Sequence, residues 1–345
     1  MEPTASARPN LAAVAALAGV SASTASLAFS GAGPVSDATR AKVLAAAEQL
    51  DYAGPDPRAQ SLRRGRSGII GVVMEDRLSG AFRDPMNVAM LDGLADELGS
   101  DTSLLLLTGT DALPSAPVDA VVLMGCSSRM SDAVTVFRQR NVPVVAIEAA
   151  PLDGVLAIDL DNFEGSRLLA RHLESLGHSH VAVVTLPFDM SRYRGPLSRE
   201  REEASDIFTT TERLRGVRSV FADAEVVVAA GSSVEEGVVA GTAALASKPT
   251  AIIAQSDLLA VGVISAALDL GLRVPDDLSV VGFDGVKLAG IAPHDLTTMV
   301  QPAVEKGRAA GRAAIALLAG EHPQPVSFTS EFHPGATTAP PASRQ

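Results

Sequence analysis

The chain has 345 residues, a formal net charge of −12 and 3% aromatic residues, none of them tryptophan. This length predicts two or three folding units, and so few aromatic side chains argue against stacking platforms for single-stranded nucleic acid. The single cysteine, Cys126, excludes an intrachain disulfide framework and a cysteine-rich metal site. The charge is unevenly divided, with +2 on residues 1–66 and −14 on residues 67–345, so the sum does not exclude DNA binding.

The first 50 residues predict three short helices. Asn10, Ser21 and Ser36 stand where N-cap residues are expected, and Gly19 can end the first helix in a left-handed conformation. Two short helices joined by a glycine-containing turn are typical of a helix-turn-helix, and the third helix can cover them with its apolar face. A small helical bundle without a DNA role is the alternative interpretation of this pattern. The predicted helices cover residues 11–18, 22–29 and 37–50.

Residues 56–66 predict a fourth, very short helix. Asp56 can cap it, Pro57 occupies its first position and Gly65 ends it. A helix of under two turns does not persist alone in water, so this basic segment is expected to fold on binding. Leu62 could act as an apolar wedge in the minor groove, with the flanking arginines on phosphates; a simple linker is the alternative.

The stretch Leu11–Val20 also resembles the apolar core of a signal peptide. Three features weaken this interpretation: Glu2 with a single basic residue, Arg8, before the stretch; its alanine-rich composition; and the structured sequence that follows. Export therefore remains an alternative, and it predicts that the N-terminus is cleaved. An intact Met1 or Glu2 in purified protein would rule it out.

From residue 69 short apolar runs alternate with helical stretches. Continuous apolar strands separated by helices predict parallel sheets that are buried on both faces. The link over residues 109–118 is about the minimum length for a parallel crossover. The predicted strands are 69–74, 104–108, 120–124, 144–147, 181–185, 226–229, 251–254 and 279–282. The predicted helices are 84–98, 131–140, 163–176, 200–221, 234–246, 258–270 and 303–318.

Polar residues at the carboxyl ends of these strands are the candidates for ligand binding, because ligands of open α/β sheets sit there. Several carboxylates and Arg213 suit a polyhydroxy ligand, since acceptors and a guanidinium fork can pair adjacent hydroxyls. Asp257 and Asp161 are also expected to cap the helices that follow them. The strand-end candidates are Asp76, Glu148, Asp189, Ser256, Asp257 and Asp284.

Four short motifs carry a resemblance to a known family. They are Ala18-Gly19-Val20-Ser21 with Thr24 and Ser26, Val35-Ser36 with Thr39-Arg40 and Lys42-Val43, Leu50 with Tyr52, and Arg58 to Arg66. In this order they resemble the LacI/GalR family of bacterial transcriptional repressors, and the resemblance continues to about residue 334. It implies an α/β fold: a small all-α helix-turn-helix headpiece plus a two-lobed periplasmic-binding-protein-like domain of parallel sheets. The implied domains are residues 1–55, a hinge helix over 56–66, and 67–345, with an N-lobe of about 67–160 and 291–322 and a C-lobe of about 161–290 and 323–340.

The resemblance also implies a set of DNA-binding residues. Ala22, Ser23 and Leu27 are implied to contact the bases. The hinge residues implied to contact DNA are Arg58, Ala59 and Leu62. Leu27 stands where the family usually has arginine, so it offers apolar contact in place of a bidentate guanine contact, which leaves the operator sequence open. Phosphate contacts are implied for Asn10, Ser21, Thr24, Ser36, Thr39 and Arg40.

The effector contacts implied by the resemblance lie in the second domain. Ser256 is shorter than the residue usual in relatives, and an aromatic residue common near residues 232–233 is absent, so the ligand's identity stays open. The implied effector-binding residues are Phe82, Glu148, Arg213, Ser256, Asp284 and Gln301.

We therefore expect a cytoplasmic, homodimeric transcriptional regulator that binds double-stranded operator DNA and a sugar-like effector. The tail after Pro334 has no heptad leucines, which favours a dimer over a tetramer. We expect no cofactor, no metal site and no membrane association, and no catalytic constellation marks the chain as an enzyme. An exported sugar-binding protein and an enzyme on the same scaffold are the alternatives.

Overall fold

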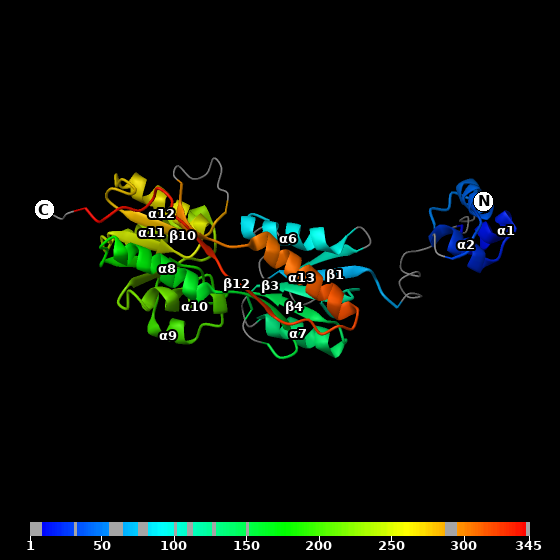
Figure 1. Ribbon diagram of the computed structural model, residues 1–345, viewed down its shortest axis with the longest axis horizontal. Helices are drawn as coiled ribbons and strands as arrows, with labels where there is room; N and C mark the ends of the chain where they lie inside the picture. The colour runs from blue at the N-terminus through cyan, green and yellow to red at the C-terminus, as the bar shows by residue number, and fades with distance from the viewer. Residues whose placement is uncertain are drawn as a thin grey trace, which may run out of the picture. The chain divides into compact units, whose positions relative to one another are not determined.

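The computed structural model describes residues 9–30, 33–54, 65–74, 82–99, 102–108, 113–125, 129–149, 152–286 and 295–342. The chain divides into two compact units, residues 1–68 and 69–345 (Figure 1). Among the described helices none alone is long and apolar enough to cross a membrane. The pair α1 (Leu11–Ala18) and α2 (Ala22–Ser30) meets the length and composition criterion only together, with a bend of 101° between them.

The first unit contains the three predicted helices: α1, α2 and α3 (Asp37–Gln49). Each begins at the expected cap, because Asn10 Oδ1 accepts from Ala13 N at 3.0 Å, and the hydroxyls of Ser21 and Ser36 accept from backbone N–H groups three residues later. Gly19 ends α1 with a φ of 67°. Buried small residues of the three helices form one core, made of Val14, Ala15, Ala25, Ala28, Val43, Ala46 and Ala47.

The second unit is built on two sheets, and all eight predicted strands are present within about two residues of their predicted ends. The first sheet has the order β12-β5-β4-β3-β1-β2 and is parallel throughout. Its strands are β1 (Ile69–Met74), β2 (Ser103–Thr108), β3 (Ala120–Met124), β4 (Val144–Ile147), β5 (Leu156–Leu160) and β12 (Val326–Phe328).

The second sheet has the order β13-β11-β10-β9-β6-β8-β7, with antiparallel strands at its two edges and parallel strands between. Its strands are β6 (Val181–Thr185), β7 (Gly195–Pro196), β8 (Glu225–Val228), β9 (Ala251–Ala254), β10 (Ser279–Asp284), β11 (Thr297–Val300) and β13 (Glu331–His333).

Helices cover both faces of each sheet, which explains the continuous apolar runs of the strands (Figure 1). In β3, Val122 packs with the core under α6 and α13, whereas its neighbour Val121 packs with the core under α7. α6 and α13 lie so close that a Cβ on Gly93 would come within 1.9 Å of Val304 O. These helices are α6 (Pro85–Leu98), α7 (Arg129–Gln139), α13 (Ala303–Leu318), and, on the second sheet, α8 (Asn162–Ser175), α10 (Phe208–Arg218), α11 (Val234–Leu245) and α12 (Asp257–Asp269).

Three features differ from the sequence-based expectation. Residues 291–322 were expected in the first lobe, but strand β11 within them pairs with β10. Residues 323–340 were expected in the second lobe, but strand β12 within them pairs with β5. The single helix expected over 200–221 is two helices, α9 (Arg199–Glu203) and α10. Ser205 separates them, because its hydroxyl donates to Phe188 O at 3.0 Å and accepts from Ile207 N at 3.3 Å. A 3₁₀ turn, Leu113–Ser115, lies in the short link between β2 and β3.

The chain passes between the two lobes of the second unit three times. The passages follow β5, β11 and β12, so Asp161, the pair Gln301–Pro302 and the residues after Phe328 all lie at the crossovers. Asp161 N donates to Phe328 O at 3.0 Å, which ties two of these passages together. Gln301 therefore lies at a point where the chain crosses from one lobe to the other.

Candidate functional site

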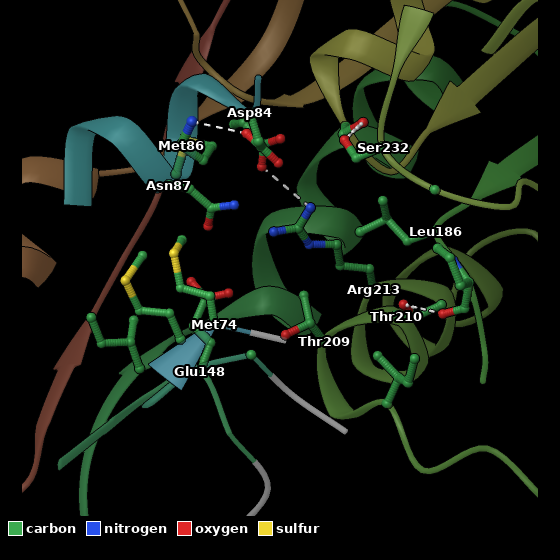
Figure 2. Close-up of a pocket in the computed structure, with 18 of the residues that line it drawn as sticks. Met74, Asp84, Met86, Asn87, Glu148, Leu186, Thr209, Thr210, Arg213 and Ser232 are labelled. Carbon is green, nitrogen blue, oxygen red and sulfur yellow. Dashed lines mark hydrogen bonds and ion pairs between the residues drawn. The ribbon is translucent and has the colours of Figure 1, made fainter. Parts of the chain in front are cut away.

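A cavity of about 260 Å³ lies between the lobes, at the carboxyl ends of strands from both sheets (Figure 2). Five of the eight methionines of the chain line it, and none of its described lining residues is aromatic. Flexible thioethers can adapt to a ligand but do not supply a flat stacking surface. The polar lining residues are Asp84, Asn87, Glu148, Asp189, Arg192, Thr209, Thr210, Arg213, Ser232, Ser256, Asp284, Gln301 and Lys306.

Arg213 occupies the centre of the C-lobe wall. Its guanidinium stacks over the Phe283 ring at 3.8 Å, and its Nε donates to Asn162 Oδ1 at 2.8 Å. Nη1 donates to Gln255 O at 2.5 Å and lies 3.3 Å from Asp284 Oδ1. The buried guanidinium is thus held in one orientation, facing the cavity as Figure 2 shows.

Gln301 joins the two lobes through its side-chain amide. Its Nε2 donates to Asp284 Oδ1 at 2.5 Å, and its Oε1 accepts from Lys306 Nζ at 2.5 Å. Lys306, 1% exposed, also donates to the carboxylate of Glu148 at the end of β4. A continuous polar chain therefore runs from Arg213 in the C-lobe through Asp284, Gln301 and Lys306 to Glu148 in the N-lobe.

The carboxylates of this network have shifted pKa values. Burial raises the pKa of Asp284 well above its usual value; Arg213 opposes the rise, while the charges of Asp257 and Asp84 add to it. Burial also raises the pKa of Asp257 to about 6, against hydrogen bonds from Thr298 and the backbone. For Glu148, burial is outweighed by Lys306, Arg213 and Asn162, which together lower the pKa below its ordinary value.

Glu148 and Asp284 also both have a positive backbone φ angle. Their φ angles are 53° and 120°, in the region that side chains other than glycine rarely adopt. Such strain persists where the surrounding structure imposes it, and it concentrates at binding sites. Both residues end a strand at the cavity, so the backbone turns each carboxylate toward the same space.

Five of the six residues predicted to contact the effector line this one cavity: Glu148, Arg213, Ser256, Asp284 and Gln301. Phe82 does not join them, being 52% exposed and absent from the lining. Asp189 also lines the cavity, and Asp76 lies outside the described residues.

The two aspartates expected to cap helices differ. Asp161 caps α8, accepting from Glu164 N at 2.9 Å, as expected. Asp257 does not cap α12, because Ser256 Oγ accepts from Leu259 N at 3.2 Å. The Asp257 carboxylate accepts from Thr298 Oγ1 at 2.6 Å and Val286 N at 2.9 Å, so it connects the start of β11 with the segment after β10.

Several cavity residues were not anticipated from the sequence, above all Lys306. Its one available signal is a lysine on the buried face of α13, where every other residue is alanine or glycine. Thr209, which lines the cavity, and Asn162, which holds Arg213, carried no signal, because hydroxyl and amide residues are common at helix starts. Among the described residues no group of three or more His, Cys, Asp or Glu side chains could hold a metal ion.

The predicted DNA-binding residues of the headpiece lie on its surface. Ala22, Ser23 and Leu27 are exposed on α2, with Leu27 37% exposed and packed against Gly33. Asn10, Ser21 and Ser36 have capping side chains at exposed helix starts, with Thr24, Thr39 and Arg40 beside them. Arg58, Ala59 and Leu62 lie outside the described residues.

Two family models match the chain. "Bacterial regulatory proteins, lacI family" matches residues 10–54, which hold the three headpiece helices. "Periplasmic binding protein-like domain" matches residues 170–338, which hold the whole second sheet and two of the three crossovers.

Curated relatives match over nearly the whole length. The HTH-type transcriptional regulator IpsA of Corynebacterium glutamicum is 32% identical over 96% of this chain and 97% of its own. The regulator Rv3575c of Mycobacterium tuberculosis is 32% identical over 99% and 100%, and the repressor CytR of Escherichia coli K12 is 29% identical over 90% and 89%. These relatives are named as transcriptional regulators, which confirms the expectation that the chain is a regulator and not an enzyme.

Two solved structures also match nearly the whole chain. A LacI-family regulator from C. glutamicum matches with a TM-score of 0.73 at 28% identity, covering 97% of this chain and all of that one. The lac repressor dimer, bound to operator and the anti-inducer ONPF, matches with a TM-score of 0.77 at 26% identity, covering 96% and 100%. The chain belongs to the LacI family of bacterial DNA-binding transcriptional regulators.

Proposed function

We propose that this protein is a repressor whose operator affinity is controlled by a polyhydroxy small molecule bound between its lobes. The observation that carries the proposal is the convergence of Glu148, Arg213, Asp284 and Gln301 on one cavity, in a chain with a helix-turn-helix headpiece. Fixed acceptors and one guanidinium suit adjacent hydroxyl groups. A solved complex of the regulator CelR with cellobiose, 25% identical with a TM-score of 0.66, supports a sugar-like ligand.

On the DNA side, α2 is the proposed recognition helix, with Ala22, Ser23 and Leu27 toward the bases. Arg40 lies near the start of α3 and is partly exposed, which supports its proposed phosphate contact. Two headpieces in a homodimer would address the two halves of a pseudo-palindrome. Because its target is DNA, we place the protein in the cytoplasm.

Ligand and DNA binding are coupled through the lobes in this proposal. A ligand that replaces part of the network around Gln301, at a crossover, changes the relative stability of two interlobe arrangements. If those arrangements space the hinge segments 56–66 differently, effector and operator affinities are linked reciprocally. The domain limits proposed here are 1–55 for the headpiece, 56–66 for the hinge and 67–345 for the ligand-binding domain.

The exported sugar-binding alternative is not favoured. The relatives with 32% identity are regulators aligned over at least 96% of this chain, and the headpiece model covers residues 10–54. The stretch that resembles a signal peptide is the folded helix α1, whose Val14 is fully buried in the headpiece core.

The test starts from an operator selected from random DNA by the purified full-length protein. We expect Leu62→Ala to abolish specific binding in a gel shift and Leu17→Ala, an exposed leucine of α1, to preserve it. Sugars and nucleosides that raise the melting temperature should then change operator affinity. Unchanged affinity of Leu62→Ala, or no ligand that changes operator binding, would contradict the proposal.

A mass measurement in solution tests the proposed assembly. We expect a dimer, because the tail after Pro334 has no heptad leucines for a four-chain coiled coil. A stable tetramer would contradict this part of the proposal.

A further inference from the structure

The N-terminus of α10 opens onto the cavity without a side-chain cap. Ile207 stands at the capping position and cannot accept a hydrogen bond, and no acidic residue occupies the first turn. Ile207, Thr209 and Thr210 all line the cavity. The first N–H groups of a helix carry partial positive charge and need acceptors, so this end presents donors to whatever fills the cavity.

Three other helices that begin beside the cavity do not share this property. α6 is capped by Asp84, α11 by Ser233 and α12 by Ser256. α11 and α12 also carry acidic residues in their first turns. A side-chain cap therefore satisfies a backbone N–H group at each of these three helix ends, whereas the start of α10 has no side-chain cap.

The hydroxyl of Thr209 gives a second, independent indication. Thr209 is 5% exposed, and its Oγ1 has no hydrogen-bond partner within the part of the chain that the structure describes. Figure 2 shows this hydroxyl pointing into the cavity. The neighbouring threonines are satisfied, since Thr210 Oγ1 donates to Pro187 O at 2.9 Å and Thr211 Oγ1 donates to Ile207 O at 3.0 Å. A buried hydroxyl left without a partner costs free energy, which a ligand acceptor would recover.

The charges around this end favour an anion. Arg213 lies one turn further along α10, and Arg192 lines the same cavity. Four carboxylates of the described residues line the cavity, and each has a partner: Glu148 pairs with Lys306, Asp284 with Arg213 and Gln301, Asp189 with Arg201, and Asp84 accepts from Met86 N. Arg213 and Arg192 therefore supply positive charge close to this helix end, and the carboxylates nearby already accept hydrogen bonds from partners within the protein.

We propose that the N-terminus of α10, with the Thr209 hydroxyl, is a subsite for an anionic group, a phosphate ester or a carboxylate, carried by the polyhydroxy effector. This inference rests on the proposed function and narrows its ligand class. The anion would accept from the first N–H groups of the helix and from Thr209 Oγ1, with Arg213 close behind.

Calorimetric titration of the full-length protein tests the subsite, with inorganic phosphate and with glucose, glucose 6-phosphate and glucuronate as matched probes. We expect at least one anionic sugar to bind about tenfold or more tightly than glucose. Thr209→Val should weaken that anionic sugar about tenfold and leave glucose unchanged, and Thr209→Asp should abolish anion binding by charge repulsion. Thr211→Val, on the same helix with its hydroxyl bonded inside the protein, is the matched control.

Thermal unfolding tests whether Thr209 serves a ligand subsite or instead supports the fold. Because Thr209→Val removes an unpartnered buried hydroxyl, the ligand-free variant should unfold at the same temperature as wild type or higher. Absence of binding by every anionic probe, or anion affinity independent of Thr209, would overturn the subsite. If a neutral sugar releases the operator while no anionic probe binds, the anionic subsite is overturned but the proposed function stands. Thr209-dependent anion binding that leaves operator affinity unchanged supports the subsite and contradicts the proposed function.

Discussion

Glu148 and Asp284 end strands in opposite lobes and face the same cavity, yet their pKa values move in opposite directions. Glu148 has the Lys306 ammonium as a dedicated partner. Asp284 shares Arg213 with the carbonyl of Gln255, and Asp257 and Asp84 add negative charge nearby. Burial is common to both, so the number of cations committed to each carboxylate decides its charge.

This difference assigns different roles to the two walls of the cavity. The N-lobe wall holds a balanced buried ion pair, which is costly to break but offers little free acceptor capacity. The C-lobe wall holds Asp284, whose Oδ1 accepts hydrogen bonds from both Arg213 and Gln301. A ligand hydroxyl that donates to Asp284 would stabilise its ionised form, so we expect the C-lobe wall to contribute more to ligand affinity.

The largest expected effect follows from Lys306→Met, which leaves the Glu148 carboxylate buried without its cation. The free energy of unfolding should fall by about 3–5 kcal/mol, the usual cost of removing one partner of a buried pair. Urea unfolding measures it, and the double variant Glu148→Gln/Lys306→Met should recover most of the loss. A Lys306→Met variant within about 1 kcal/mol of wild type would refute the dedicated pairing of Glu148.

A matched pair of amide substitutions tests the comparison itself. Glu148→Gln leaves the Lys306 ammonium without a counter-charge and should destabilise the protein by about 1–3 kcal/mol at pH 7. Asp284→Asn keeps an acceptor for Arg213 and Gln301 and removes a carboxylate whose ionisation burial opposes, so it should be neutral or stabilising. Equal destabilisation of the two variants by chemical denaturation would remove the distinction between them.

The pH dependence sharpens the same comparison. The folded-state pKa of Asp284 lies above its unfolded value of 3.8, so its contribution to stability is full below 3.8 and is lost as pH rises through the folded pKa. The stability of wild type minus that of Asp284→Asn should therefore fall with rising pH. For Glu148, whose pKa is lowered from 4.5, the advantage of wild type over Glu148→Gln is present above 4.5 and lost as pH falls further. Chemical denaturation at a series of pH values measures both stability differences. A difference that changes with pH in the opposite direction, for either variant, would contradict the direction of that residue's pKa shift.

The smallest effect is expected at an exposed pair of the same chemistry. Arg199 and Glu203 on α9 are bonded at 2.7 Å, but the arginine side chain is 90% exposed. Solvent screens this pair, so Arg199→Ala should change the free energy of unfolding by no more than about 0.5 kcal/mol. A loss as large as that of Lys306→Met would show that burial does not separate the two pairs.

Sequence patterns predicted most of the fold. Eight strands were predicted from continuous apolar runs, and Asn10, Ser21 and Ser36 cap their helices as expected. β11 was missed since its Thr297 and Thr298 read as polar, although sheet pairing buries both. In the site, carboxylates at strand ends were predictable from topology. Lys306 was not, because its partner Glu148 lies 158 residues away and only the tertiary fold brings them together.

The central claim is that a ligand in the cavity controls operator affinity through Asp284 and its network. The most direct measurement is the operator Kd of wild type and Asp284→Asn, with and without a saturating cavity ligand found by thermal shift. We expect the ligand to change the Kd of wild type by about fivefold or more and to leave that of Asp284→Asn unchanged at the same concentration. An unchanged Kd in wild type, or an equal change in both proteins, would contradict the account.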